Sequence, residues 1–155
     1  MSTYNADVLN WEIRSDPCEL PAVRERFAAW AIGHGWSKEQ SAEIALAVDE
    51  ALSNVIRHSY DCETTHTIQI ALETIESSDH GPGLEIRLRD FGQQVDPANI
   101  KGRALDDVRP GGLGVHIIRA MMNSAEYSRA SGGGMLLVMR KYKNHTVDSR
   151  RPQAN

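Results

Sequence analysis

The sequence predicts an α+β protein in which helices cover one face of a mixed β-sheet, forming a two-layer sandwich. The expected elements run strand, helix, helix, strand, strand, loop, helix, strand, strand, which is not the regular alternation of parallel α/β proteins. The spacing of apolar residues also changes from about 3.6 to about 2 beyond residue 66, which separates helices from strands. A chain of 155 residues, 41% of them hydrophobic, is long enough for one core and too short for two.

The first part of the chain predicts a strand and then an amphipathic helix. Residues 4–14 hold apolar side chains in an extended pattern, and residues 15–17 (SDP) end this strand. Between residues 19 and 32 apolar residues recur at spacings of three and four, and the glycines beyond them end the helix. The apolar stripe of this helix is Leu20, Val23, Phe27, Trp30 and Ala31.

A second helix is predicted from Ser37 to near His58 or Tyr60. Ser37 and Gln40 have the spacing of a capping box, in which each side chain accepts a hydrogen bond from the other residue's backbone. Apolar residues at helical spacing predict the buried stripe of this helix. They are Ile44, Val48, Ala51, Leu52 and Val55.

The second half of the chain predicts four strands and one helix. Residues 68–72 and 84–90 alternate apolar and polar side chains on either side of a turn, which predicts a hairpin. Residues 91–112 are polar and interrupted by glycine and proline; so long a connection is typical of a functional loop. A short helix from Gly114 to about Asn123 precedes two strands, of which the second, residues 135–142, is apolar enough for the interior of the sheet. We expect one domain over residues 1–143 and a disordered polar tail over residues 144–155.

Composition makes several functions unlikely candidates. The formal net charge of −4 is too small and of the wrong sign to hold a nucleic acid. Neither a charged start followed by an apolar run nor a stretch of about 18 apolar residues is present, so we expect a cytoplasmic protein that binds no membrane. The two cysteines, Cys18 and Cys62, are expected to be free buried thiols. His58, Cys62 and His66 have the spacing of zinc ligands on one helix face, but the residues after Cys62 favour a helix end that would separate them.

Polar residues form a stripe on the second helix, beside its apolar one. A rotation of about 100° per residue puts Glu43, Glu50, Asn54 and Arg57 within this stripe. Glu50 and Asn54 point the same way, so a carboxylate able to take a proton stands beside an amide oxygen able to hold a hard cation. A solvated helix face is the alternative interpretation.

An acidic residue stands on the core side of a predicted strand. Asp90 is in phase with Leu84, Ile86 and Leu88. A buried carboxylate needs donors, so Asp90 either caps local backbone or accepts from a ligand such as the exocyclic amine of a base. Gly92 would let a ligand ring approach the backbone closely.

Glycines precede the last predicted helix. Residues 111–114 (GGLG) lead directly into it, and free N–H groups at a helix start favour a phosphate. The residues match neither a Walker A motif nor the dinucleotide fingerprint G-x-G-x-x-G. Taken together, the three features predict a base pocket, a phosphate site and a helix that carries a metal ligand and a general base.

These motifs resemble the GHKL ATPases, in the form found in bacterial anti-sigma-factor serine kinases. Residues 47–60 (AVDEALSNVIRHSY) resemble the N box, residues 90–97 the next box and residues 111–114 the glycine box that closes a lid. Residues 19–24 (ELPAVR) resemble the first helix of this family, so the resemblance covers roughly residues 8–142. It implies a Bergerat-type, histidine-kinase-like ATPase sandwich.

The resemblance also implies roles for individual residues. Glu50 would be the general base, Asn54 would hold Mg²⁺ and Asp90 would accept from the adenine amine. The other residues expected at the nucleotide are Arg57, His58, Gly92, Gly111, Gly112, Leu113, Gly114 and Val115, together with Arg109, which could reach the phosphates from the loop. Two positions depart from the family. Gln94 replaces a glycine, and Gly134 replaces a Thr or Asn that supports the adenine-side acid, so we expect Asp90 to be held by water alone.

The resemblance finally implies an activity and partners. It implies an ATP- and Mg²⁺-dependent kinase that phosphorylates a serine on a small STAS-type antagonist protein and sequesters a sigma factor, acting as a homodimer. One alternative is a nucleotide-responsive binding module with little or no kinase activity, which would need the same pocket. The other is the detached catalytic domain of a histidine kinase, which residues 19–24 disfavour.

Overall fold

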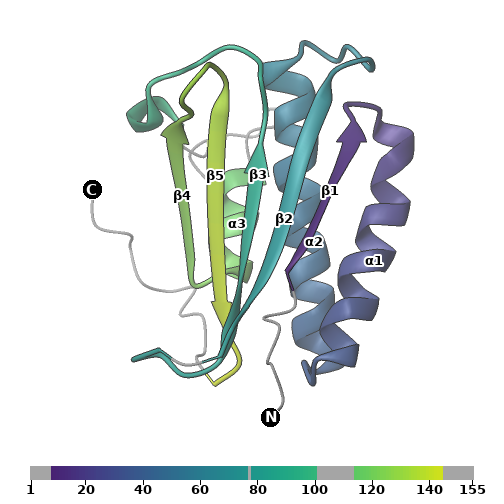
Figure 1. The fold of residues 1–155 in the computed structure, drawn as a ribbon, viewed down its shortest axis with the longest axis vertical. Helices are drawn as coiled ribbons and strands as arrows, with labels where there is room; N and C mark the ends of the chain where they lie inside the picture. Colours follow the sequence, from purple (N-terminus) through teal and green to yellow (C-terminus); the bar gives the residue numbers. More distant parts are fainter. Residues whose placement is uncertain (1–7, 77, 101–113, 145–155) are drawn as a thin grey trace.

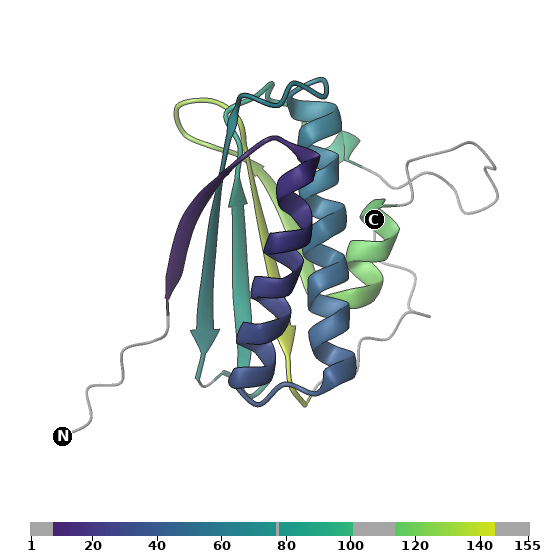
Figure 2. The ribbon, with the colours of Figure 1, turned by 90° about the vertical axis from the view of Figure 1, so that its right-hand side faces the viewer.

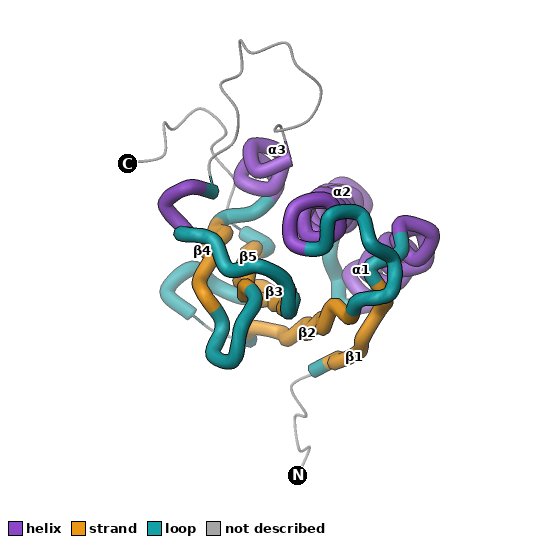
Figure 3. The backbone as a smooth tube through the Cα atoms, turned by 90° about the horizontal axis from the view of Figure 1, so that it is seen from above, coloured by secondary structure: helices purple, strands orange, loops and turns teal. Residues whose placement is uncertain are grey.

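The computed structural model describes residues 8–76, 78–100 and 114–144, and these form two layers. Five strands make one sheet, and the helices of the described residues all lie on one of its faces (Figures 1, 2 and 3). The strands are β1 (Leu9–Arg14), β2 (Thr67–Ile75), β3 (Gly83–Arg89), β4 (Ser124–Arg129) and β5 (Met135–Tyr142). The helices are α1 (Leu20–Gly33), α2 (Lys38–Asn54) and α3 (Gly114–Met121). The predicted α+β sandwich is confirmed.

The sheet is antiparallel throughout the described strands, so the expectation of a mixed sheet is wrong. The strand order is β1-β2-β3-β5-β4, and each neighbouring pair runs antiparallel. Strands β3 and β4 do run in the same direction, as a crossover through α3 requires. Because β5 returns between them, they never become neighbours. The prediction that residues 135–142 form an interior strand is confirmed.

The helix boundaries follow local capping chemistry. Before α1, the Asp16 side chain accepts from the backbone N–H of Cys18 (2.9 Å). At α2 the predicted capping box is present, with hydrogen bonds of 3.0 and 3.2 Å between Ser37 and Gln40. The turn Val55–Ser59 extends α2 as a π-helix, so the helical path ends where the sequence predicted.

The core lies between the sheet and the helices. The predicted apolar stripes of α1 and α2 supply its buried side chains from one layer, and alternate residues of β2, β3 and β5 supply them from the other. One lysine is also buried. Lys141 of β5 is 2% exposed; its Nζ pairs with Glu43 of α2 at 2.8 Å and donates to the Met121 carbonyl at the end of α3. Lys141 therefore ties two helices to the sheet.

Both cysteines are free but exposed, so the expectation of buried thiols is wrong. Cys18 lies in the short turn before α1, and Cys62 lies in the turn after the π-helix. Asp61 and Cys62 have positive φ values of 48° and 63°, which take the chain out of the helical path. His58, Cys62 and His66 therefore do not share a helix face. His66 instead contacts Glu63 (2.6 Å).

Several predictions concern residues outside the described part of the chain. The predicted first strand began at residue 4; the described strand begins at Leu9, and residues 1–7 are not described. The centre of the predicted functional loop, residues 101–113, and the predicted tail, from residue 145 onward, also lie outside it.

Candidate functional site

A cavity of about 490 Å³ brings the predicted motifs together. Its size is within the usual range for small-molecule sites. It lies where α2, α3 and the ends of β3 and β5 meet. The residues that line it are Ala51, Asn54, Val55, His58, Ser59, Asp90, Gln93, Val95, Asn99, Ile100, Gly114, Val115, Tyr127 and Met135. Five of the predicted site residues are among them: Asn54, His58, Asp90, Gly114 and Val115.

The start of α3 lies against the polar stripe of α2. A Cβ atom at Gly114 would be 2.9 Å from Asn54 Nδ2 and 3.0 Å from Glu50 Oε2. Only glycine fits here without displacing those two side chains. The structure thus places the N-terminus of α3 beside the predicted base and the predicted metal ligand. Free N–H groups at a helix start attract anions, so this corner of the cavity suits a phosphate.

The stripe on α2 divides into two parts with different contacts. Glu43, at one end, pairs with buried Lys141 and therefore serves the packing of the fold. At the other end Arg57 Nη2 donates to Asn54 Oδ1 at 2.9 Å. An amide oxygen has two lone pairs, so Asn54 Oδ1 keeps one acceptor position for a cation. Mg²⁺ bound to a nucleotide is commonly held by few protein oxygens, with phosphates and water completing its ligands, so the free acceptor position of Asn54 fits this ion.

Asp90 is buried just beyond the end of β3, with 3% of its surface exposed. Its Oδ1 accepts from the backbone N–H groups of Gly92 (3.0 Å) and Met135 (3.2 Å). Its Oδ2 accepts from the Ser59 hydroxyl at 3.1 Å. The expectation that water alone would hold this carboxylate is therefore wrong. Protein donors hold it, and one of them, Ser59, comes from the π-helix that follows α2, a segment distant in sequence.

Two glycines let three segments of the chain approach closely behind Asp90. Gly134 has a φ of +74°, and a Cβ there would overlap the Asp90 carbonyl oxygen. A Cβ at Gly92 would overlap the Ser59 carbonyl oxygen, so Gly92 makes room for protein backbone rather than lining the cavity. Gln94, which departs from the family pattern, donates to the carbonyls of Ala130 (2.8 Å) and Gly134 (3.1 Å). The glutamine thus joins this turn to the β4–β5 hairpin.

Two tyrosines that are not among the predicted site residues support the site. The Tyr60 hydroxyl accepts from the Phe91 N–H (2.7 Å) and donates to the Thr67 carbonyl (2.7 Å), next to Asp90. Burial raises the pKa of Tyr60, and the hydrogen bond from Phe91 partly offsets that rise. Tyr127 of β4 lines the cavity, and burial raises its pKa to about 12. Both phenols therefore stay neutral near pH 7.

The sequence motifs did not predict the other lining residues from the segment after β3, because this segment lacks the helical or strand spacing of apolar residues that the prediction used. Gln93, Val95, Asn99 and Ile100 fall in the polar segment after β3, where only the two isolated apolar residues could have indicated contact with a ligand. Four predicted residues, Arg109, Gly111, Gly112 and Leu113, lie outside the described part of the chain.

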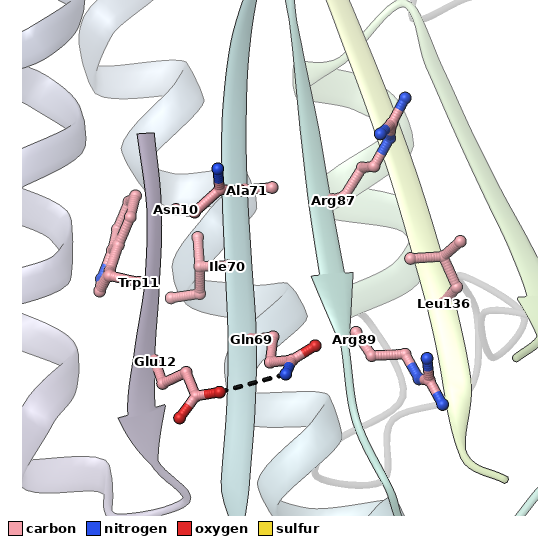
Figure 4. A pocket seen from close by; sticks show the side chains of 9 residues that line it. All are labelled: Asn10, Trp11, Glu12, Gln69, Ile70, Ala71, Arg87, Arg89 and Leu136. Carbon is pink, nitrogen blue, oxygen red and sulfur yellow. Dashed lines mark hydrogen bonds between the residues drawn. The ribbon is translucent and has the colours of Figure 1, made fainter. Parts of the chain in front are cut away.

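A second cavity of about 490 Å³ lies on the face of the sheet opposite the helices (Figure 4). Strand residues alone line it, and several of its polar groups are already hydrogen-bonded to other protein groups. Gln69 donates to Glu12 at 3.1 Å, and Arg89 Nη2 donates to the carbonyls of Ser131 and Gly133, both at 2.9 Å. None of the motifs on α2 or α3 reaches this face. The cavity beside α2 and α3 is therefore the candidate site.

The fold and the cavity together define a class of protein. An antiparallel sheet covered on one face by helices, with a cavity between the long helix and the strand ends, is the architecture of the histidine-kinase-like ATPases. The chain belongs to this family: the model of the histidine kinase-like ATPase domain matches residues 13–141. The family resemblance found in the sequence is confirmed.

Curated relatives and a solved structure agree with this assignment. The chain is 27% identical to the serine-protein kinase RsbW of Oceanobacillus iheyensis, over 92% of this chain and 89% of the relative. It is 27% identical to the serine/threonine-protein kinase BtrW of Bordetella bronchiseptica, over 84% of this chain and 81% of the relative. The crystal structure of the RsbU and RsbW domains of Rv1364c from Mycobacterium tuberculosis has a similar fold, with a TM-score of 0.59 at 15% identity. That match covers 87% of this chain and 31% of the other.

Both of these curated relatives align with the chain over most of their length, and both are named as serine or serine/threonine kinases. Within the described residues, no helix combines the length and the apolar character needed to cross a membrane.

Proposed function

We propose that this protein binds ATP in the cavity between α2 and α3 and transfers its γ-phosphoryl group to a serine of a small STAS-type antagonist protein. We propose further that it acts in the cytoplasm as a homodimeric anti-sigma factor, which holds a sigma factor when the antagonist is phosphorylated. The named kinases among its relatives and the family motifs support this proposal.

One observation carries the proposal: Gly114, at the start of α3, lines the same cavity as Asn54 and Asp90 and lies against the Glu50 carboxylate. A nucleotide needs an acceptor for its base amine, positive potential for its phosphates and an oxygen ligand for the accompanying cation. Asp90, the N-terminus of α3 and Asn54 supply these three functions in one cavity of suitable size. Glu50 adds a carboxylate beside the phosphate end.

The transfer can be written with these residues. The serine oxygen of the partner forms a bond to the γ-phosphorus, the bond from that phosphorus to the β,γ-bridging oxygen breaks, and ADP leaves. Glu50 accepts the proton of the serine hydroxyl. The N–H groups at the start of α3, together with Arg57, stabilise the charge on the phosphate oxygens. Asn54 would hold Mg²⁺, which would neutralise further phosphate charge.

Binding is tested by calorimetric titration with Mg-ATP and Mg-ADP. The wild-type chain should bind both. Asp90→Asn should abolish most of the binding, because the amide would present an N–H₂ donor, in place of an acceptor oxygen, to the base amine. If the wild type does not bind, the cavity is not a nucleotide site and the proposal is wrong.

Transfer is tested separately, with a serine-containing STAS-type partner. Glu50→Ala should bind Mg-ATP with nearly wild-type affinity and form no phosphoserine. Glu39→Ala is the matched control, because Glu39 is an exposed glutamate in the first turn of the same helix. Unchanged turnover in Glu50→Ala would refute its assignment as the base. Mg-ATP binding without transfer in the wild type would favour the nucleotide-responsive binding module instead.

A further inference from the structure

The hydrogen bonds of Asp90 leave one acceptor position open. An ionised carboxylate offers about four lone-pair positions, two on each oxygen. Two backbone N–H groups occupy both positions of Oδ1, and the Ser59 hydroxyl occupies one position of Oδ2. Asp90 lines the cavity, although only 3% of it is exposed. The remaining position of Oδ2 is therefore the place where a ligand donor can bind.

Among the described residues, Ser59 provides the one side-chain donor to this carboxylate. The two other donors are backbone groups, which belong to the turn after β3 and the start of β5. Gly134 lies directly behind Asp90, but its positive φ and its contact with the Asp90 carbonyl leave no room for a side chain there. Ser59, at the end of the π-helix, provides the hydroxyl from the opposite side. It is half-buried and itself lines the cavity.

We infer that Ser59 is a positioning residue that makes the pocket selective for purines with a 6-amino group. Its hydroxyl fixes the orientation of Oδ2 and fills one of its lone pairs, so that a single acceptor faces the ligand. An exocyclic amine satisfies that acceptor, whereas a ring without a donor at this position leaves the buried carboxylate one bond short. This inference rests on the proposed nucleotide site and adds the residue that tunes its base selectivity.

Removing the hydroxyl should weaken the contact with the amine in particular. In Ser59→Ala, two positions of Oδ2 are open, so water can take the place of the hydroxyl and compete with the ligand amine for this oxygen. The phosphate end of the cavity, at Gly114, is formed by other residues and should keep its geometry. The variant should therefore lose affinity for ATP and lose much less for an analogue that lacks the amine.

The experiment compares two nucleotides on three proteins. Calorimetry measures the affinities of Mg-ATP and of magnesium purine riboside triphosphate, which has hydrogen in place of the 6-amino group. In the wild type we expect ATP to bind about tenfold more tightly, since one hydrogen bond to a charged group is lost in the analogue. In Ser59→Ala we expect ATP affinity to fall about tenfold and the preference to approach one. Ser53→Ala is the control, because Ser53 lies on α2 and does not line the cavity.

The outcomes separate this inference from the proposed function. If Ser59→Ala loses affinity for both nucleotides equally, or keeps the wild-type preference, the residue does not position Asp90 and the inference is wrong while the nucleotide site stands. If the wild type binds neither nucleotide, the proposed function fails and the inference fails with it. Loss of preference in Ser59→Ala and not in Ser53→Ala supports the inference. Thermal unfolding of each variant excludes a general loss of structure as the cause.

Discussion

Replacement of Gly114 by alanine should damage the site and leave the fold intact. The added Cβ would lie 2.9 Å from Asn54 Nδ2 and 3.0 Å from Glu50 Oε2. Both atoms are ends of side chains, so they can move by rotation, whereas the backbone of α3 can stay in place. Displacing Asn54 also strains or breaks its hydrogen bond with Arg57.

In the free energy of unfolding, the gain from placing alanine in a helix and the loss of the hydrogen bond nearly cancel. Nothing offsets the loss in ligand binding. Alanine is favoured over glycine by up to about 1 kcal/mol in a helix, and losing the hydrogen bond from Arg57 costs about 1 kcal/mol. We therefore expect the free energy of unfolding to change by less than about 1 kcal/mol. A displacement of about 1 Å in a positioned group typically costs about a hundredfold in rate, so a smaller shift predicts roughly a tenfold loss in the rate of transfer. Losing one contact to the charged phosphate end costs about 1.4 kcal/mol, which predicts roughly a tenfold loss in Mg-ATP affinity.

Calorimetry with Mg-ATP and urea unfolding on the same samples test this prediction. Gly33→Ala is the matched control: Gly33 ends α1, and a Cβ there meets nothing within 4 Å. Mg-ATP affinity in Gly114→Ala within about twofold of the wild type would refute the close approach of α3 to the stripe on α2. An equal loss of affinity in Gly33→Ala would also refute it.

Three further predictions concern stability. Gly134→Ala should destabilise the fold by about 3 kcal/mol or more, from a left-handed backbone and an overlap with the Asp90 carbonyl. Gly133→Ala, with a φ of +105° and no atom near its Cβ, should cost clearly less in urea unfolding, and equal losses would contradict the overlap. Glu43→Gln should cost about 3 kcal/mol because it leaves the buried Lys141 charge without its counter-charge, whereas Lys141→Met removes that charge and should cost only about 1–2 kcal/mol by orphaning the Met121 carbonyl; the reverse order would be inconsistent with these contacts. Burial raises the pKa of Tyr127 to about 12 from an ordinary value near 10, so the unfolded chain loses this proton first and stability falls as pH rises from about 10 to about 12. Chemical unfolding against pH should show a shallower fall in Tyr127→Phe, by up to about 2–3 kcal/mol at the top of the range, and parallel curves would contradict the raised pKa of this half-buried phenol.

Local patterns predicted most of the fold because they report on one element at a time. The capping box at Ser37 and the apolar stripe of α2 depend only on helical geometry, and the alternation in residues 68–72 and 84–90 depends only on the pleat of a strand. Strand order is different. Strand β5 lies between β3 and β4, which makes the described sheet antiparallel throughout. This order depends on pairing between distant segments, which the spacing of apolar residues within one strand does not encode.

The same division holds for the candidate site. The residue types and their spacing on α2, at Asp90 and before α3 were sufficient to identify the family and to predict one shared pocket, because each motif is a short segment with its own chemistry. The sequence by itself therefore determined the class of protein and the residues to consider. Only the tertiary structure decided their partners. Glu43 forms an ion pair with buried Lys141 and so does not contribute to the site, and Ser59, 31 residues away along the chain, donates to Asp90. Such contacts depend on how the helices pack on the sheet. Packing brings together side chains that are far apart along the chain, and no local sequence pattern predicts that they will meet.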